Sequence, residues 1–255
     1  MYHLSDGLTL KGGVLTGYKA PSLRNSAPDF SATSMGGVSI GNPNLKPETS
    51  VGYEAGVDYE NKDLGFKTSL VAYQTDFKDK ITRSSAFLCA PNTVCVYNGK
   101  TYPAHIYGYK ETINVDEAEI KGLEFAFDYQ ITQKLSSRSN YALTDSEIKT
   151  GTSAGSPLND QPKHTFNTGL SYDFTKMTNL WAQLSYIGEF ISTDLVTSTS
   201  TSQSYSLVDL GVVHRLNKEL TLKFGIYNLA NKEIYNSSNG FVDGRKYSAS
   251  FTYSF

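Results

Sequence analysis

Long hydrophobic runs are missing from this sequence. In 255 residues, no apolar stretch approaches the roughly 20 residues that a transmembrane helix needs, so a helical membrane protein is excluded. An excess of charge of one sign is missing as well, because the chain has 23 Lys and Arg and 25 Asp and Glu. This balance gives no indication of a nucleic-acid partner or of an anionic membrane surface. The first residues also lack a basic stretch followed by an apolar core, so no signal peptide is visible.

Sulfur-containing residues and tryptophan are scarce, whereas phenol and phenyl rings are abundant. The chain has two Cys, three Met and one Trp, against 18 Tyr, 13 Phe and 21 Gly. Tyr and Phe fit the pleated surface of a sheet, and Gly fits turns. The composition therefore predicts an all-β fold.

Apolar and polar residues alternate along several segments, as they do in strands that have one apolar and one polar face. The clearest case is the end of the chain, where every second residue from Tyr247 to Phe255 is apolar or aromatic. The same pattern, in stronger or weaker form, covers nine more segments: 8–18, 51–59, 64–77, 122–130, 135–145, 166–174, 180–190, 205–216 and 220–226. We therefore expect about ten strands, each close to the 9–11 residues that cross a bilayer when tilted.

The connections between these segments alternate between short and long. Short ones lie near 61–63, 132–134, 175–178 and 217–218, and long ones cover roughly 19–48, 79–112, 147–162, 191–203 and 230–244. This alternation is typical of an antiparallel transmembrane β-barrel with tight periplasmic turns and long external loops. An open sheet in lipid would leave backbone groups unpaired at both edges. The chain is therefore either a complete ten-stranded barrel or part of a larger one.

Five segments, in the same order, resemble the TonB-dependent outer-membrane receptors, chiefly those of the siderophore and colicin type. They are GYKAPSL (17–23), GNPNLKPETS (41–50), NVDEAEIKGLEF (114–125), PKHTFNTGLSY (162–172), and YNLANKEIY (227–235) with GRKYSASFTYSF (244–255). Structural roles for the residues of these motifs, such as shaping turns and strand ends, remain an alternative to ligand binding.

The resemblance implies that residues 1–255 are the C-terminal portion of a 22-stranded barrel, with the plug domain and the TonB box absent. It places the protein in lipid, in the outer membrane of a Gram-negative bacterium. It implies uptake of an iron–siderophore complex, with a catecholate favoured, energised by TonB–ExbB–ExbD through the missing plug. The portion would not be active alone, and no catalytic residues, cofactor or resident metal ion are expected.

External loops carry the candidate ligand-binding residues. Aromatic faces and cations in these loops suit a flat anionic chelate. The candidates are Arg24, Arg83, Tyr97, Lys100, Tyr102, Tyr107 and Tyr109, with His105 and Lys110 in the same loop. Cys89 and Cys95 lie in that loop too, where an oxidising compartment favours a disulfide over a metal site. An ordinary aromatic girdle with solvated loop charges is the alternative for these aromatic and cationic residues.

Two other functions stay open for a complete ten-stranded barrel. One is an outer-membrane protease, for which His105, Asp194 and Asp243 are the available side chains. Peptide hydrolysis that is lost in His and Asp variants would support it. The other is a passive pore, which ion conductance by the purified chain in a planar bilayer would support.

Overall fold

The computed structural model describes residues 1–27, 31–34, 37–84, 86–151, 154–158, 160–194, 198–236, 240–242 and 244–255. In these ranges no helix has the length and apolar character needed to cross a membrane. Strands account for nearly all of the regular structure, as the composition predicts.

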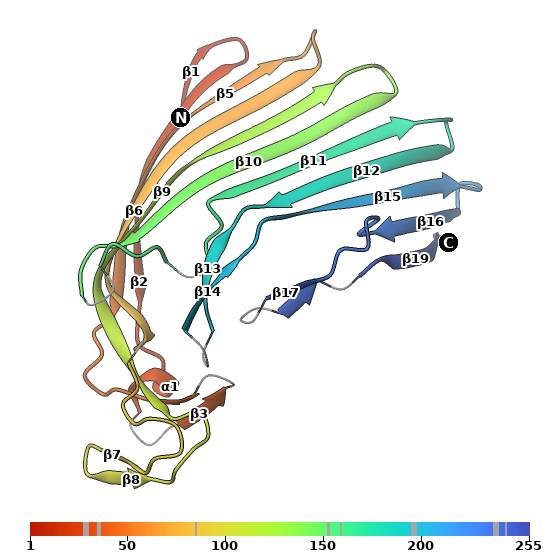
Figure 1. Ribbon diagram of the computed structural model, residues 1–255. Helices are drawn as coiled ribbons and strands as arrows, with labels where there is room; N and C mark the ends of the chain where they lie inside the picture. Colours follow the sequence, from red (N-terminus) through yellow and green to blue (C-terminus); the bar gives the residue numbers. More distant parts are fainter. Residues whose placement is uncertain are drawn as a thin grey trace.

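A 13-stranded sheet dominates the fold (Figure 1). Its main path is an antiparallel meander in which each strand pairs with the next one named. The path runs through β1 (Tyr2–Ser5), β2 (Leu8–Lys19), β5 (Glu48–Asn61), β6 (Phe66–Arg83), β9 (Tyr109–Gln130), β10 (Leu135–Ile148), β11 (His164–Asp173), β12 (Thr178–Ile187), β15 (Tyr205–Arg215), β16 (Leu220–Tyr227) and β19 (Lys246–Tyr253). The ten expected strands are all present.

The cross-strand register separates the two faces of this sheet. Val57 lies between Leu10 and Leu70 on one face, while Asp58 lies between Thr9 and Ser69 on the other. Large apolar side chains on the first face remain exposed, for example Phe251 at 73%. Apolar side chains that stay exposed along a whole curved sheet indicate contact with lipid.

Charged groups on the opposite face pair with each other across the strands. The Lys11 ammonium donates hydrogen bonds to Asp58 (2.7 Å) and to the Ser69 hydroxyl (3.0 Å). A hollow of about 670 Å³ with Asp128, Arg138 and Trp181 in its lining opens along strands of the same sheet. The polar face is therefore the lumen side of the wall.

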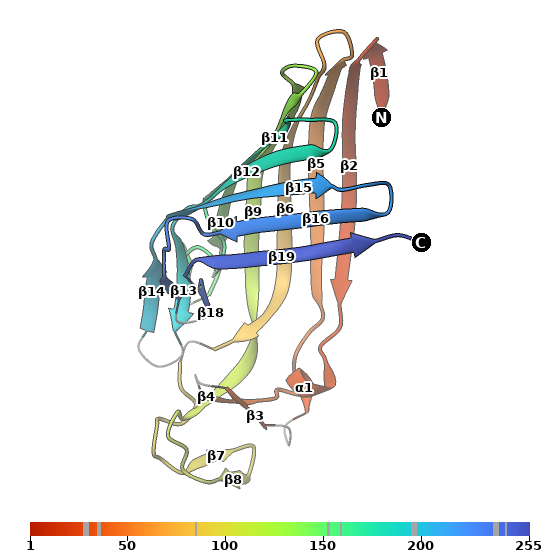
Figure 2. The same ribbon diagram turned by 90° about the vertical axis from the view of Figure 1, so that its right-hand side faces the viewer.

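Short and long connections occupy opposite edges of the sheet (Figures 1 and 2). The turns 62–65, 131–134, 174–177 and 216–219 lie along one edge. The long connections carry the other short elements, which are α1 (Leu23–Ser26), β3 (Ser31–Ser34), β4 (Gly37–Ile40), β7 (Cys95–Tyr97), β8 (Lys100–Tyr102), β13 (Phe190–Asp194), β14 (Ser198–Ser202), β17 (Ile234–Asn236) and β18 (Gly240–Val242). The expected alternation of turns and loops is confirmed.

Three details differ from the sequence-based expectation. Strands β6 and β9 extend further than expected, so the loop placed at 79–112 covers only 84–108. The charged stretch around Asp79, whose φ is 53°, interrupts the alternation, but the ladder resumes at Lys80 opposite Val115. β1 is absent from the sequence-based prediction because four residues carry too little periodicity.

The described strands do not close into a ten-stranded barrel. β1 and β19 stand at the two ends of the main path, and each pairs on one side only. The sheet is therefore part of the wall of a larger barrel. Of the two predicted architectures, a complete ten-stranded barrel and part of a larger barrel, the structure has the second.

Candidate ligand-binding face

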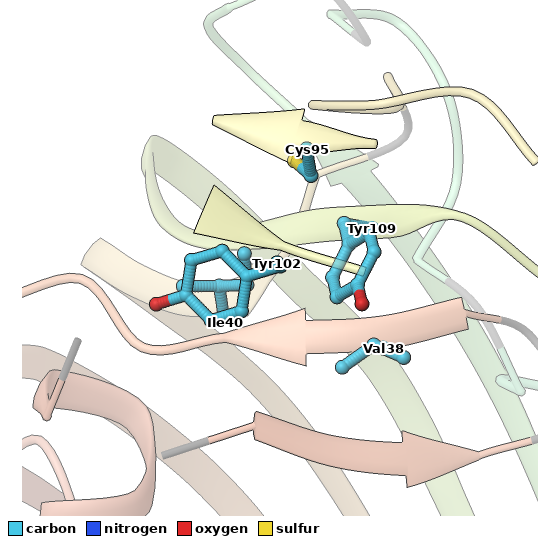
Figure 3. Close-up of a cluster of buried hydrophobic side chains, with 5 residues drawn as sticks. All are labelled: Val38, Ile40, Cys95, Tyr102 and Tyr109. Carbon is cyan, nitrogen blue, oxygen red and sulfur yellow. The ribbon is translucent and has the colours of Figure 1, made fainter. Parts of the chain in front are cut away.

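A small hydrophobic core organises the long loops (Figure 3). It consists of Val38 and Ile40 from β4, Cys95 from β7, Tyr102 from β8 and Tyr109 at the start of β9. Ile40 and Cys95 are fully buried. Loops usually run over the surface of a protein and bury few side chains. Here two long loops contribute side chains to one buried cluster, which therefore holds the two loops together.

β4 reaches this core by pairing with β9. β10 pairs with β9 as far as Ala118, and the Lys149 N–H and the Thr150 hydroxyl bond the Glu117 backbone next to it, so the start of β9 is available to another strand. β4 takes this edge in parallel, with Val38 opposite Tyr109 and Ile40 opposite Glu111. Residues 38–40 are thereby held against the start of β9.

The Cys89–Cys95 disulfide ties the tip of the second loop to the same strand. Its sulfur atoms are 2.09 Å apart. Cys89 and Tyr109 exchange backbone hydrogen bonds, with the Tyr109 N–H donating to the Cys89 carbonyl at 2.9 Å. The disulfide therefore joins β7 to a segment that is itself bonded to β9.

The 41–50 motif serves mainly to fasten the first loop. The buried Glu48 carboxylate accepts the Ile81 N–H at 3.2 Å and lies within 3.6 Å of the Lys19 and Lys80 ammonium groups. The Asn114 side-chain amide accepts from the Lys46 N–H (2.8 Å) and donates to the Lys46 carbonyl (3.0 Å). These contacts support the structural alternative for this motif.

The 227–235 motif is also structural. Asn228 is buried with φ 52°, and its side chain bonds both backbone groups of Lys232. Asn231, also at positive φ, accepts the Arg245 N–H at 2.8 Å. Asn tolerates this left-handed conformation, which the tight exit from β16 requires.

Three cations from separate segments lie near the loop core: Arg83 is opposite Thr112 in the β6–β9 ladder, two residues from Lys110, and the charge of Arg24 acts on Arg83. Arg24 lies on α1, Arg83 ends β6, and Lys110 is the second residue of β9. Burial, and then the charge of Arg24, lowers the pKa of Arg83. Burial, and then the charge of Arg83, lowers the pKa of Lys110, whose ammonium lies 4.5 Å from the centre of the Phe87 ring. An anion placed here would relieve the repulsion among the three charges.

The predicted tyrosines have different surroundings. Tyr102 and Tyr109 are 7% and 3% exposed, and the Tyr109 hydroxyl donates to the Pro103 carbonyl at 2.6 Å. These two rings lie in the loop core, and their predicted role in ligand binding stays a prediction. The Tyr97 hydroxyl donates to Glu111 at 2.5 Å, and burial together with this bond raises its pKa to about 12.

The remaining candidates lie at the rim of the loop core. The Tyr107 ring is half-buried, 5.6 Å from the His105 ring, and the Lys100 ammonium lies 5.4 Å from the Tyr102 ring centre. Their role in ligand binding stays a prediction. The structure adds Lys110 to the Arg24–Arg83 pair. The sequence places this lysine in the loop, but only the fold brings it to the two arginines.

No arrangement for proteolysis or metal binding is apparent in the ranges given above. The His105 Nδ1 accepts the Tyr107 N–H at 3.2 Å. Asp194 ends β13, and Asp243 lies outside the described residues. No group of three or more His, Cys, Asp or Glu side chains among the described residues is arranged to hold a metal ion.

Comparison with known proteins agrees with this architecture. The family model described as "TonB dependent receptor-like, beta-barrel" matches residues 1–229. The chain belongs to this TonB-dependent receptor family. An iron-regulated outer membrane virulence protein of Vibrio cholerae is 39% identical over 97% of the chain. A ferric enterobactin receptor of Pseudomonas aeruginosa is 30% identical over 92% of the chain. The chain spans 37% and 33% of the length of these two relatives.

Solved structures of TonB-dependent receptors have the same wall. A ferric enterobactin receptor variant from P. aeruginosa, in complex with enterobactin, superposes with a TM-score of 0.78 at 26% identity, covering all of this chain and 39% of that one. A siderophore receptor from Acinetobacter baumannii gives 0.76 at 25% identity, covering 99% of this chain and 40% of that one. The family and the apolar outer face place this chain in the outer membrane.

Proposed function

We propose that this chain forms part of the ligand-capturing wall of an outer-membrane receptor for ferric siderophores, with an anionic ferric catecholate as the preferred ligand. The cluster of Arg24, Arg83 and Lys110 carries the proposal. It gathers positive charge at the loop edge of the wall, with Arg24 exposed, Arg83 half-buried and Lys110 buried.

The chemistry of the cluster fits this class of ligand. A ferric tris-catecholate carries net negative charge and flat rings, whereas a ferric trihydroxamate is neutral. Guanidinium groups donate charge-assisted hydrogen bonds to anionic oxygens, and the half-buried Tyr107 ring offers an aromatic face in the same loop that precedes Lys110. The related P. aeruginosa receptor variant that binds enterobactin in its crystal structure supports the same class.

Uptake requires parts beyond those described here. We propose that the wall is completed to about 22 strands and works with a plug domain through which TonB–ExbB–ExbD energises release. Under this proposal, collapse of the inner-membrane proton gradient stops iron uptake and leaves binding at the surface intact. The chain has no catalytic role in this scheme.

The experiment is equilibrium binding of ferric tris-catecholate and ferric trihydroxamate to the assembled receptor. R24Q and R83Q should each weaken catecholate binding about tenfold, since a hydrogen bond to a charged group is worth about 1.5–3 kcal/mol. Hydroxamate binding should not change. K232Q, which removes an exposed external charge outside the cluster, is the matched control. Equal effects of R83Q and K232Q would refute the proposal.

A further inference from the structure

The edge of the wall opposite the ligand face carries a second candidate site. The turn 131–134 and the neighbouring strand β11 enclose a groove of about 540 Å³. Its lining residues are Thr132, Gln133, Lys134, Leu135 and Tyr172. Leu135 and Tyr172 are opposite each other in the register and belong to the apolar, lipid-facing side of the sheet.

The walls of this groove are fixed by hydrogen bonds. The Thr132 hydroxyl accepts from the Lys134 N–H (3.2 Å) and from the Leu135 N–H (3.0 Å). The Asp173 N–H donates to the Lys134 carbonyl at 2.8 Å, which holds the turn against β11. The backbone of Lys134 is therefore positioned, while its side chain stays exposed.

The adjacent turn, 174–177, repeats the same combination of residues. Lys176 is exposed between Phe174 and Met177, which are 58% and 55% exposed. The Phe174 ring lies 6.4 Å from the Tyr172 ring, so the apolar surface is continuous from one turn to the next. Exposed aromatic rings beside lysines are typical of the membrane–water interface.

Charge distinguishes these two turns from their neighbours. The turns 62–65 and 216–219 each contain a carboxylate next to their lysine, Asp63 and Glu219, whereas 131–134 and 174–177 contain none. Asp173, which precedes the second of these turns, accepts a hydrogen bond from the Asn179 side-chain amide at 2.9 Å. Among the described residues, no ion pair or hydrogen bond engages the ammonium of Lys134 or Lys176. The balanced charge of the whole chain hides this local excess.

We propose that the groove lined by residues 132–135 and Tyr172, together with the adjoining turn 174–177, binds an anionic phospholipid of the inner leaflet. The acyl chains lie along the apolar side of the sheet, and the phosphate meets Lys134 and Lys176. A lysine can extend its apolar stem along the hydrocarbon boundary and keep its ammonium at headgroup level. Attraction of this kind is worth about fivefold in binding for each lysine near the surface.

The single tryptophan of the chain allows a direct test. In the variant Y172W/W181F, the only indole of these 255 residues lies in the groove, and its quenching is measured as the difference from Y172F/W181F, which lacks it. The full chain, purified from outer membranes in its assembled state, is reconstituted with brominated phosphatidylglycerol or brominated phosphatidylcholine. Quenching of the indole by each lipid gives their relative binding constants. We expect phosphatidylglycerol to bind at least about fivefold more strongly.

Two variants test whether the lysines of these two turns cause this preference. In the same background, K134Q/K176Q should abolish the preference, so that the two lipids bind about equally. K218Q, which alters a turn with its own carboxylate, should leave the preference unchanged. If the glutamine variant fails to assemble, K134R/K176R should assemble and retain the preference, and loss of the preference there would count against the proposal. Equal quenching by both lipids in the parent, or equal loss in K218Q, would overturn it.

Soluble glycerol phosphate separates a membrane lipid from a free phosphate ion. In excess it should leave the preference unchanged, because it lacks the acyl chains that contact the apolar face. Displacement of phosphatidylglycerol by the soluble compound would instead identify an anion site that is independent of the membrane.

Discussion

Reduction of the Cys89–Cys95 disulfide is expected to loosen the external loop core and to leave the barrel wall unchanged. The disulfide closes a ring with a sequence separation of 6. For a ring of about seven residues, loop closure contributes about 2.4 kcal/mol at 25 °C in the chain-entropy account. Because Cys95 is fully buried among Val38, Ile40 and Tyr109, that loss falls on the contact between the two loops.

Hydrogen exchange measures the effect at single amides. A change of about 2.4 kcal/mol corresponds to about 50-fold in a local opening equilibrium. We expect up to this loss of protection at the Tyr109 N–H, bonded to the Cys89 carbonyl, and at the Val38 N–H, bonded to the Gly108 carbonyl at 2.9 Å. Amides in the ladder between β10 and β11 should not change.

Reduced wild-type protein is the main sample, because it keeps every side chain. C89A/C95A serves as the second sample and should show the same pattern with a somewhat larger loss, since it also removes buried sulfur. Unchanged protection at Tyr109 and Val38 after reduction would refute the role given to the disulfide. Equal loss of protection in β10 and β11 would show that the loop core and the wall unfold together.

Three further predictions concern single side chains. A spectrophotometric difference titration of wild type against Y97F should show a phenol with a midpoint of about 12. Since this folded pKa lies above the usual value of about 10, the stabilisation from its bond to Glu111 is complete below pH 10 and lost as the pH rises toward 12. G211A should shift the emission of the sole tryptophan, because an added Cβ would meet the Trp181 ring, at a cost of about 1–3 kcal/mol in unfolding experiments. E48A should destabilise the loop edge by about 1–3 kcal/mol and E48Q by less, since the glutamine retains an acceptor for the backbone N–H; equal losses in hydrogen exchange would contradict this.

The sequence carried most of the information about the wall. Strict alternation in segments such as 51–59 places apolar residues on one face, and the register of Val57 with Leu10 and Leu70 follows that pattern. Charge obscured the alternation toward the C-terminal end of β6, where Lys80 belongs to the strand. The lumen and lipid faces were therefore predictable, but the strand ends were less so.

The loop face was less accessible to sequence reasoning. Parallel pairing of β4 with β9 joins residues 38–40 to 109–111, and no local pattern specifies such a long-range contact. That pairing places Val38 opposite Tyr109 in the loop core, while the β6–β9 ladder, in which Arg83 is opposite Thr112, brings Lys110 beside Arg83. A tyrosine fits equally well in a small core and on a binding surface, so composition alone could not separate Tyr102 from Tyr107.

The most direct test of the proposed function locates the iron. Crystals of the assembled receptor soaked with ferric tris-catecholate would show the metal by its anomalous scattering. We predict an iron peak on the loop side of the wall, with catecholate oxygens within hydrogen-bonding distance of Arg24, Arg83 or Lys110. An iron peak bound elsewhere, with these three side chains free of the ligand, would contradict the proposal.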